Sequence, residues 1–172
     1  SNGPCGFAYN PGTALSENYR NYFFVTEFPG KNIRAFRTKP EGAGFKMVDE
    51  HVAHHGLMTT GINFGPDGAL YLADWGNNGW APHEKGRIMK LDSPRAIDRP
   101  LRIQTRKLLG DGFAMRDDTE LSRLLAHADQ RVRLESQFEL VKRNASNALL
   151  TVAKENDSQL ARIHAIWGIG QL

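Results

Sequence analysis

The pattern of apolar and polar positions changes character part-way along the chain. Up to residue 92, short aromatic and β-branched runs alternate with segments rich in Gly, Pro and Asn. From residue 117 onward, Leu, Ala, Arg, Glu and Gln dominate, and Pro is absent beyond residue 120. These compositions favour strands and helices respectively. We therefore predict a β-rich part over 6–92, a connector over 93–116 that contains two prolines, and a helical part over 117–172.

Six short segments of the first part are predicted to be strands. Turn signals separate them, and the clearest is Gly-Pro-Asp-Gly at 65–68, where Pro66 presets φ and Gly68 tolerates a positive φ. Short strands at regular spacing are typical of a sandwich, a barrel or a propeller. The predicted strands are Tyr22–Thr26, Asn32–Thr38, Phe45–Val48, Thr59–Phe64, Leu70–Ala73 and Arg87–Leu91.

The helical part contains residues that typically cap helices. A first helix is predicted from Asp118 to Ala126, and Asp129 is expected to cap a second. Leu134, Phe138 and Val141 recur in that second helix at the spacing of one helical face. The remaining predicted helices are Ala148–Ala153 and a last one, capped by Asp157 or Ser158, that runs towards Leu172.

A nine-residue pattern in the helical part occurs twice. Residues 161–169 align with residues 132–140 at an offset of 29 residues, so that Arg162 matches Arg133 and Trp167 matches Phe138. A helix-pair repeat of this length is typical of an α-solenoid, although two ordinary amphipathic helices would give the same spacing. We expect Phe138 and Trp167 to be packing residues, and the two arginines to bond a neighbouring turn or to face water.

Composition excludes several classes of protein. The chain has 172 residues, 40% apolar and 24% charged, with a net charge of +3 and one cysteine. These values argue against disorder, a disulfide framework, a Cys-rich zinc site and a nucleic-acid partner. No apolar run approaches the roughly 18 residues of a transmembrane helix. The chain begins with Ser rather than Met and shows no signal peptide, which we interpret as a processed chain or a fragment.

Several motifs together resemble one protein family. The chain is similar to the glucose/sorbosone dehydrogenase-like β-propellers that use pyrroloquinoline quinone (PQQ). It resembles most the large multidomain proteins of planctomycetes and verrucomicrobia labelled membrane-bound dehydrogenases, in which a propeller is followed by HEAT-like helical repeats. The motifs are the Gly65–Trp75 run, Lys85–Ile88, Leu124–His127, Asp129–Leu140 and Leu160–Trp167.

The resemblance implies a fold and two alternative functions. The expected fold is a partial β-propeller of about two four-stranded blades followed by HEAT-like repeats. The expected function is that of a fragment of a secreted or periplasmic bacterial oxidoreductase, a PQQ-dependent sugar or alcohol dehydrogenase. Its parent would hold the missing blades and a haem domain that accepts electrons, so we expect the isolated chain to be inactive and marginally stable. The alternative is a non-catalytic scaffold that binds carbohydrate or protein.

The resemblance also implies a His base, cationic side chains around the quinone and a calcium ion. His54 and His55 are candidates for the base, because they are predicted to lie in a loop before a strand; a solvated pair of loop histidines is the alternative. His83 is a further candidate base, and Arg87 is the candidate for stabilising charge on the quinone.

The long loop over residues 76–85 is the most site-like segment, because long loops on rigid scaffolds often carry binding sites. A variable surface loop without a ligand is the alternative. Asp74 could bind a cation or orient Arg87, although such a residue more often fixes a loop through backbone hydrogen bonds. The candidate cofactor contacts are Asp74, Trp75 and Trp80, and the candidate calcium ligands are Asp74, Asn77, Asn78 and Glu84.

Overall fold

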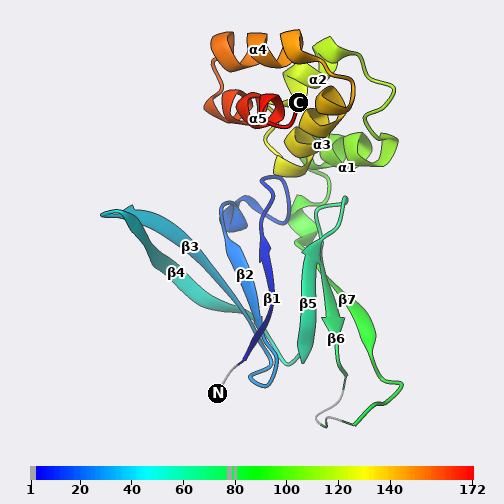
Figure 1. Cartoon of the computed structure of the whole chain (residues 1–172). Coiled ribbons are helices and arrows are strands. Elements are labelled where there is room, and N and C mark those ends of the chain that lie inside the picture. Colours follow the sequence, from blue (N-terminus) through cyan, green and yellow to red (C-terminus); the bar gives the residue numbers. More distant parts are fainter. Residues whose placement is uncertain (1–2, 77–78, 80) are drawn as a thin grey trace. The chain divides into compact units, whose positions relative to one another are not determined.

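The computed structural model of the chain describes residues 3–76, 79 and 81–172. The chain forms two compact units, Ser1–Arg102 and Ile103–Leu172. In the described residues the first unit contains two antiparallel sheets, of four and three strands, and the helical region follows them in sequence (Figure 1). The predicted segregation of strands and helices is therefore confirmed. No closed propeller is formed by the described strands.

The first sheet is a four-stranded meander in which each strand pairs with the next along the chain. The second sheet repeats this arrangement with three strands. Strands Thr59–Phe64 and Arg87–Leu91 have the bounds that the sequence predicts. The strands are β1 (Pro4–Tyr9), β2 (Phe23–Glu27), β3 (Asn32–Glu41) and β4 (Gly44–His55) in the first sheet, and β5 (Thr59–Phe64), β6 (Leu70–Asp74) and β7 (Arg87–Leu91) in the second.

The core of the β unit lies between the two sheets. Phe24 and Ile33 from the first sheet and Leu70 and Leu72 from the second are almost completely buried in it. Strand β5 contacts β1 and β2, so the first strand of one sheet lies against the first strand of the other. A Cβ atom at Gly6 would lie 2.9 Å from a methyl carbon of Ile62 on β5, and glycine is therefore needed for this close approach.

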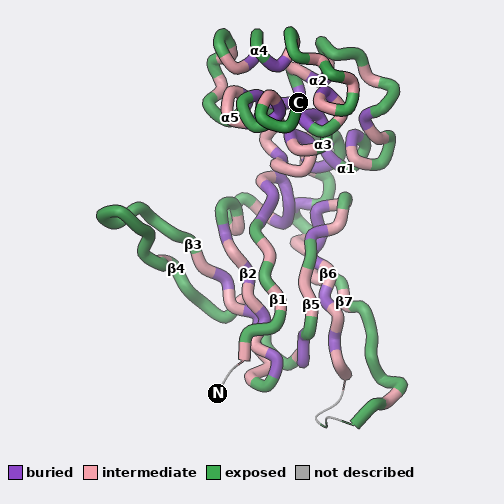
Figure 2. The backbone as a smooth tube through the Cα atoms, in the orientation of Figure 1, coloured by how far each residue is buried: buried purple, intermediate pink, exposed green. Residues whose placement is uncertain are grey.

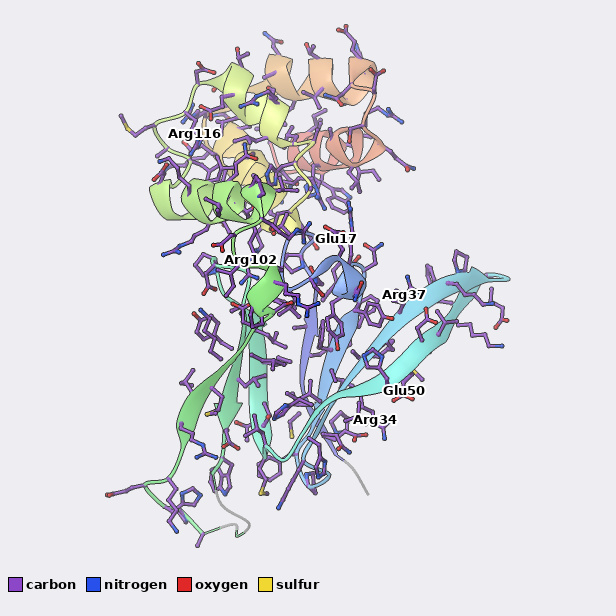
Figure 3. All side chains as sticks on the ribbon, turned by 180° about the vertical axis from the view of Figure 1, so that it is seen from behind. Glu17, Arg34, Arg37, Glu50, Arg102 and Arg116 are labelled. Carbon is purple, nitrogen blue, oxygen red and sulfur yellow. The ribbon has the colours of Figure 1, made fainter. Side chains whose placement is uncertain are left out.

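The hairpin of β3 and β4 extends beyond the rest of its sheet (Figures 1 and 2). Residues 37–47 are all exposed, and ion pairs supplement the backbone ladder that joins the two strands. Arg34 pairs with Glu50 (Figure 3), and Arg37 pairs with Asp49. Strand β4 is more than twice as long as the predicted Phe45–Val48, because its polar second half gives no apolar alternation.

The connector contains structure that its prolines do not predict. Helix α1 covers Pro100–Asp111, and Pro100 opens it rather than blocking it, because the first helical residue needs no backbone donor. Asp129 and Ser158 cap their helices, as predicted, by accepting hydrogen bonds from Arg131 N and Ala161 N. The other helices are α2 (Asp118–Leu124), α3 (Gln130–Lys142), α4 (Ser146–Glu155) and α5 (Gln159–Ile169).

The internal sequence repeat corresponds to a repeat of contacts. Arg133 donates hydrogen bonds to the carbonyl oxygens of His127 and Ala128, at 2.7 and 3.0 Å. Arg162 donates to the carbonyl oxygens six and five residues before it, in Asn156 and Asp157, at 2.6 and 3.1 Å. Helices α3 and α5 contact each other, as do α2 and α4. The repeated arginines therefore fasten the turn that precedes each helix, one of the two roles expected for them.

The predicted packing of the repeated aromatic residues is wrong. The exposed fractions of Phe138 and Trp167 are 47% and 55%. The buried face of α3 instead carries Val132, Ser136 and Leu140. The hydroxyl of Ser136 donates to the carbonyl oxygen of Val132, so it is satisfied in the interior. A hydropathy pattern favours the face with more apolar residues and overlooks a buried face that contains satisfied polar groups.

Arg143 holds the loop between α1 and α2. Its guanidinium donates to the carbonyl oxygens of Arg116 and Ala114, at 2.6 and 2.7 Å, and to the Glu139 carboxylate at 2.9 Å. Replacing Arg143 with alanine would leave these partners unmatched, and we expect the helical unit to lose about 2 kcal/mol of unfolding free energy. Urea unfolding followed by circular dichroism would measure the loss. The neighbouring Lys142→Ala variant is the control, and a loss as large there would contradict this role.

Candidate functional site

The candidate site residues come together at one end of the two sheets. The antiparallel order brings the starts of β1, β3, β5 and β7 to the same end as the finishes of β2, β4 and β6 (Figure 1). His54 and His55 finish β4, Asp74 finishes β6 and Arg87 begins β7. We call this end the loop-76 end, after the loop that joins β6 to β7.

The prediction that His54 and His55 lie in a loop is wrong. Both belong to β4, where they pair with Ile33 and Asn32 of β3. The Nδ1 atom of His55 lies 2.8 Å from Oδ1 of Asn32, whose amide nitrogen donates to Glu27. The amide oxygen therefore accepts from the imidazole. His55 is the last residue of β4 and makes a cross-strand contact; the chain turns at Gly56, which has a φ of 108°.

The buried carboxylate of Asp74 forms an ion pair with Arg87. Its Oδ2 atom accepts a hydrogen bond from Nε of Arg87 at 2.8 Å. The Asp74 side chain is 2% exposed, whereas the Arg87 side chain is 59% exposed. Thr59 lies opposite Asp74 in the ladder, and its buried hydroxyl has no hydrogen-bond partner among the described residues. Of the roles considered for Asp74, orienting Arg87 is the one that its geometry supports.

Trp75 is fixed by contacts on several sides. Its ring meets Phe28 edge-on at 6.3 Å and His83 edge-on at 4.8 Å, measured between centroids. Its indole Nε1 donates to the carbonyl oxygen of Gly79 at 2.8 Å. Nδ1 of His83 accepts from Lys85 N at 2.9 Å, which places the proton of the neutral ring on Nε2. His83 therefore positions the tryptophan and the loop.

A small cavity of about 210 Å³ opens beside this tryptophan. Its lining exposes apolar atoms of Cys5, Phe28, Thr60 and Trp75. The sequence pattern identified only Trp75 among them as a site residue. Phe28 could have been predicted as a site residue, because an antiparallel meander brings the turn at Phe28–Asn32 to the same end as the loop after β6.

The candidate calcium and PQQ contacts do not form a complete site within the described residues. Asn77, Asn78 and Trp80 lie outside the described residues, and Glu84 is exposed on the loop. Among the residues that the structure describes, no three His, Cys, Asp or Glu side chains gather as metal ligands. Asp74 is already engaged by Arg87. Among the described residues, no cationic side chain lines the cavity beside Trp75.

The neck of the loop after β6 requires a glycine. Gly76 has a φ of 75°, and a Cβ atom there would lie 2.1 Å from the carbonyl oxygen of Lys85. We expect Gly76→Ala to cost at least about 1–2 kcal/mol from the left-handed backbone alone and to disorder the surroundings of Trp75. Tryptophan emission and thermal unfolding would measure both effects. Gly86→Ala is the control, since its Cβ would meet nothing closer than 3.9 Å; equal effects would refute the argument.

A second polar cluster lies at the opposite end of the β unit and has a structural role. Arg102 is buried, and it donates to the carbonyl oxygen of Asp67 at 2.6 Å and to the Asp92 carboxylate at 2.8 Å (Figure 3). Burial raises the pKa of Asp67, but hydrogen bonds from Lys90, Ala69 N–H and the Tyr71 hydroxyl together outweigh burial and lower the pKa. These bonds fix the predicted turn at 65–68.

The chain matches no protein-family model, no curated protein and no solved structure in the three comparisons. The family resemblance in the sequence therefore stays a prediction. Of the helices in the described ranges, none has both the length and the apolar character needed to cross a membrane.

Proposed function

We propose that the β unit contributes about two blades to a β-propeller and that the helical unit is a short HEAT-like array. Each propeller blade is a four-stranded meander. The sequential order β1-β2-β3-β4, the new sheet that starts at β5 and the contact of β5 with β1 support this assignment. The repeated arginine contacts at an offset of 29 residues support the helical array.

We propose that the chain acts as a non-catalytic scaffold that binds carbohydrate at the loop-76 end. The carrying observation is the fixed indole of Trp75 at the edge of the small cavity. A rigid aromatic ring offers an apolar platform to a sugar with little loss of side-chain entropy on binding. The candidate bases favour binding over catalysis, because His55 bonds Asn32 and His83 bonds the backbone of Lys85.

Titration of the full chain with neutral oligosaccharides, followed by tryptophan emission and calorimetry, tests the proposal. Cellotriose, xylotriose and chitotriose are suitable probes. We expect at least one to bind, and Trp75→Ala to weaken that binding at least about tenfold, or 1.4 kcal/mol. Trp167→Ala is the matched control, since Trp167 is an exposed tryptophan of the helical unit. Binding that survives Trp75→Ala, or binding by none of the probes, would overturn the proposal.

A second candidate function is the PQQ-dependent sugar or alcohol dehydrogenase. It is favoured by the Gly65–Trp75 run together with Lys85–Ile88, which form the β5–β6 turn, β6 and the start of β7. On this proposal a longer, secreted or periplasmic parent supplies the further blades, most contacts to PQQ and calcium, and the haem domain. Calcium-dependent binding of PQQ to the chain, seen as quenching of tryptophan emission, would support it. Absence of quenching at saturating calcium would favour the scaffold.

A further inference from the structure

The first sheet carries a cluster of aromatic side chains on its outer face, the face opposite to the one that carries Phe24. Phe7 stacks on Phe23, and Phe23 stacks on Phe36, with ring centroids 5.5 and 5.4 Å apart. Tyr9 also contacts Phe23, at 4.7 Å between centroids. The four rings therefore form one continuous group across β1, β2 and β3, which we call the outer aromatic cluster.

Strand β2 is apolar on both of its faces. Phe23 and Val25 alternate with Phe24, which is fully buried against the second sheet, so these two residues lie on the outer face. An antiparallel strand with one face in water usually alternates between apolar and polar residues. Strand β2 departs from that pattern, and the outer face is apolar in the way expected of a face that another protein surface covers.

The polar groups next to the cluster are already paired. The Tyr9 hydroxyl donates to Oδ1 of Asn21 at 3.2 Å. Arg34, on the same face of β3 as the cluster, forms ion pairs with Glu27, at 3.0 Å, and with Glu50. Burying an ion is costly mainly when its partner is missing. An apolar surface can therefore cover this face without leaving these charges unpaired.

The size of the outer face fits one side of a dimer interface. A fully buried aromatic ring covers 150–250 Å², and Phe7 and Tyr9 are 60% and 38% exposed, so the four rings leave about 300 Å² of apolar surface in water. Val25 and the exposed Val52 add to this area. A standard interface uses about 800 Å² from each protomer, little more than half of it apolar. The cluster, the two valines and the neighbouring ion pairs together approach that area and composition.

We propose that two copies of the chain associate through their outer faces, related by a two-fold axis. Such an axis sets the same patch of each copy against itself, so the two aromatic clusters pack on each other. The outer face of the second sheet is a more polar surface, because Asn63, Tyr71 and Lys90 lie side by side on it and Lys90 pairs with Asp67. Pairing of the two aromatic faces buries more apolar area. The proposal does not depend on carbohydrate binding.

Sedimentation equilibrium of the full chain over a range of concentrations tests the proposal. We expect a reversible monomer–dimer equilibrium with a Kd of about 1 μM or lower, as for interfaces of standard size. The dimer would have twice the 19.2 kDa mass of the chain. A chain that is still monomeric at about 100 μM, where such a dimer would be almost completely formed, would overturn the proposal. In that case a further part of a longer protein would be the candidate for covering the face.

Variants locate the interface. We expect Phe7→Asp to raise the Kd at least about tenfold, because it places a charge among the packed rings. Val52→Asp, a change at a half-exposed residue on another strand, should act in the same direction and serves if Phe7→Asp does not fold. Ile88→Asp is the matched control, because Ile88 is 70% exposed on β7 of the second sheet and should leave the dimer unchanged. Circular dichroism would show whether each variant is folded.

The outcomes distinguish the proposed interface from its alternatives. A dimer that neither Phe7→Asp nor Val52→Asp weakens would overturn the proposal, because the copies would associate through another surface. Equal weakening by Ile88→Asp would also overturn it, because the first sheet of one copy would then contact the second sheet of the next. That head-to-tail contact would give rings or open chains of copies rather than a two-fold dimer.

Discussion

Replacing Phe24 with alanine is expected to cost the β unit about 3–5 kcal/mol of unfolding free energy. Phe24 is fully buried between the two sheets, where its ring meets that of Phe64 edge-on at 5.7 Å. Truncation removes this ring and leaves a cavity that strands cannot easily close, because both sheets are held in register by their ladders. Urea unfolding monitored by circular dichroism, with the strand signal separated from the helix signal, would measure the loss.

The chain offers a matched control for this substitution. Phe45 lies in the exposed first part of β4 and has an exposed fraction of 76%. We expect Phe45→Ala to change the unfolding free energy by less than about 0.5 kcal/mol, as for other exposed substitutions. Similar losses in the two variants would mean that the sheets do not pack through Phe24, and the two-sheet core described above would be wrong.

Acidification is expected to destabilise the helical unit through His164. This residue is 2% exposed, and its Nδ1 lies 2.8 Å from Oε1 of Gln137. The Gln137 amide donates in turn to Gln171, so His164 is the donor to the Gln137 oxygen. Burial lowers the pKa of His164 to about 4, and the positive charge of Arg133 adds to the effect.

The sign of the pH effect follows from this lowered pKa. As the pH falls below about 6.5, the unfolded chain takes up a proton at His164 that the folded unit excludes until about pH 4. The stabilisation is therefore complete above pH 6.5, declines between pH 6.5 and 4, and is lost below pH 4. At about 1.4 kcal/mol for each pKa unit, the decline reaches up to about 3.5 kcal/mol. Burial also lowers the pKa of His127, so its contribution has the same sign.

A variant separates this effect from general acid denaturation. Urea unfolding of the helical unit at pH 7.5, 6, 5 and 4 can be followed by the emission of Trp167, whose ring contacts that of His164 at 5.3 Å. We expect His164→Gln to flatten most of the pH dependence, whatever its effect on absolute stability. A pH dependence unchanged by this substitution would show that another group carries it. In the β unit, the lowered pKa of Asp67 acts only below about pH 4.

Strong local signals made most of the β unit predictable. Thr59–Phe64 and Arg87–Leu91 are bounded by turns that have a clear mechanism, and both strands match the prediction. Strand β1 was not predicted, because its Pro, Cys and Gly residues give a weak strand signal. Its formation depends on pairing with β2 and on the close approach of Gly6 to Ile62, and both are tertiary contacts.

The helical unit shows the limits of hydropathy patterns. Caps at Asp129 and Ser158 are local and were predictable. The buried face of α3 was not predictable. Gln137 is buried there because its side chain forms hydrogen bonds with His164 on α5 and with Gln171 just after α5. The buried face of α3 therefore differs from the predicted one, and Phe138 is exposed. Trp167 is likewise exposed on α5.

The positions of the candidate residues were predictable, and their contacts were predictable only in part. Asp74, Trp75, His83 and Arg87 do lie at one end of the sheets, since strand and turn signals fix the meander. The contact of Asp74 with Arg87 was among the expected roles, whereas the hydrogen bond of His83 to the backbone of Lys85 depends on how the loop folds. Phe28 and Cys5 join the site from segments that are distant in sequence.

Mapping of a bound sugar by NMR tests the central claim most directly. The amide and indole signals of the ¹⁵N-labelled chain are followed during titration with the tightest-binding oligosaccharide. The carbohydrate-scaffold account predicts shifts concentrated at the Trp75 indole and the amides of Thr60 and Phe28, which line the cavity. Shifts confined to the helical unit, or no shifts at any sugar concentration, would contradict it.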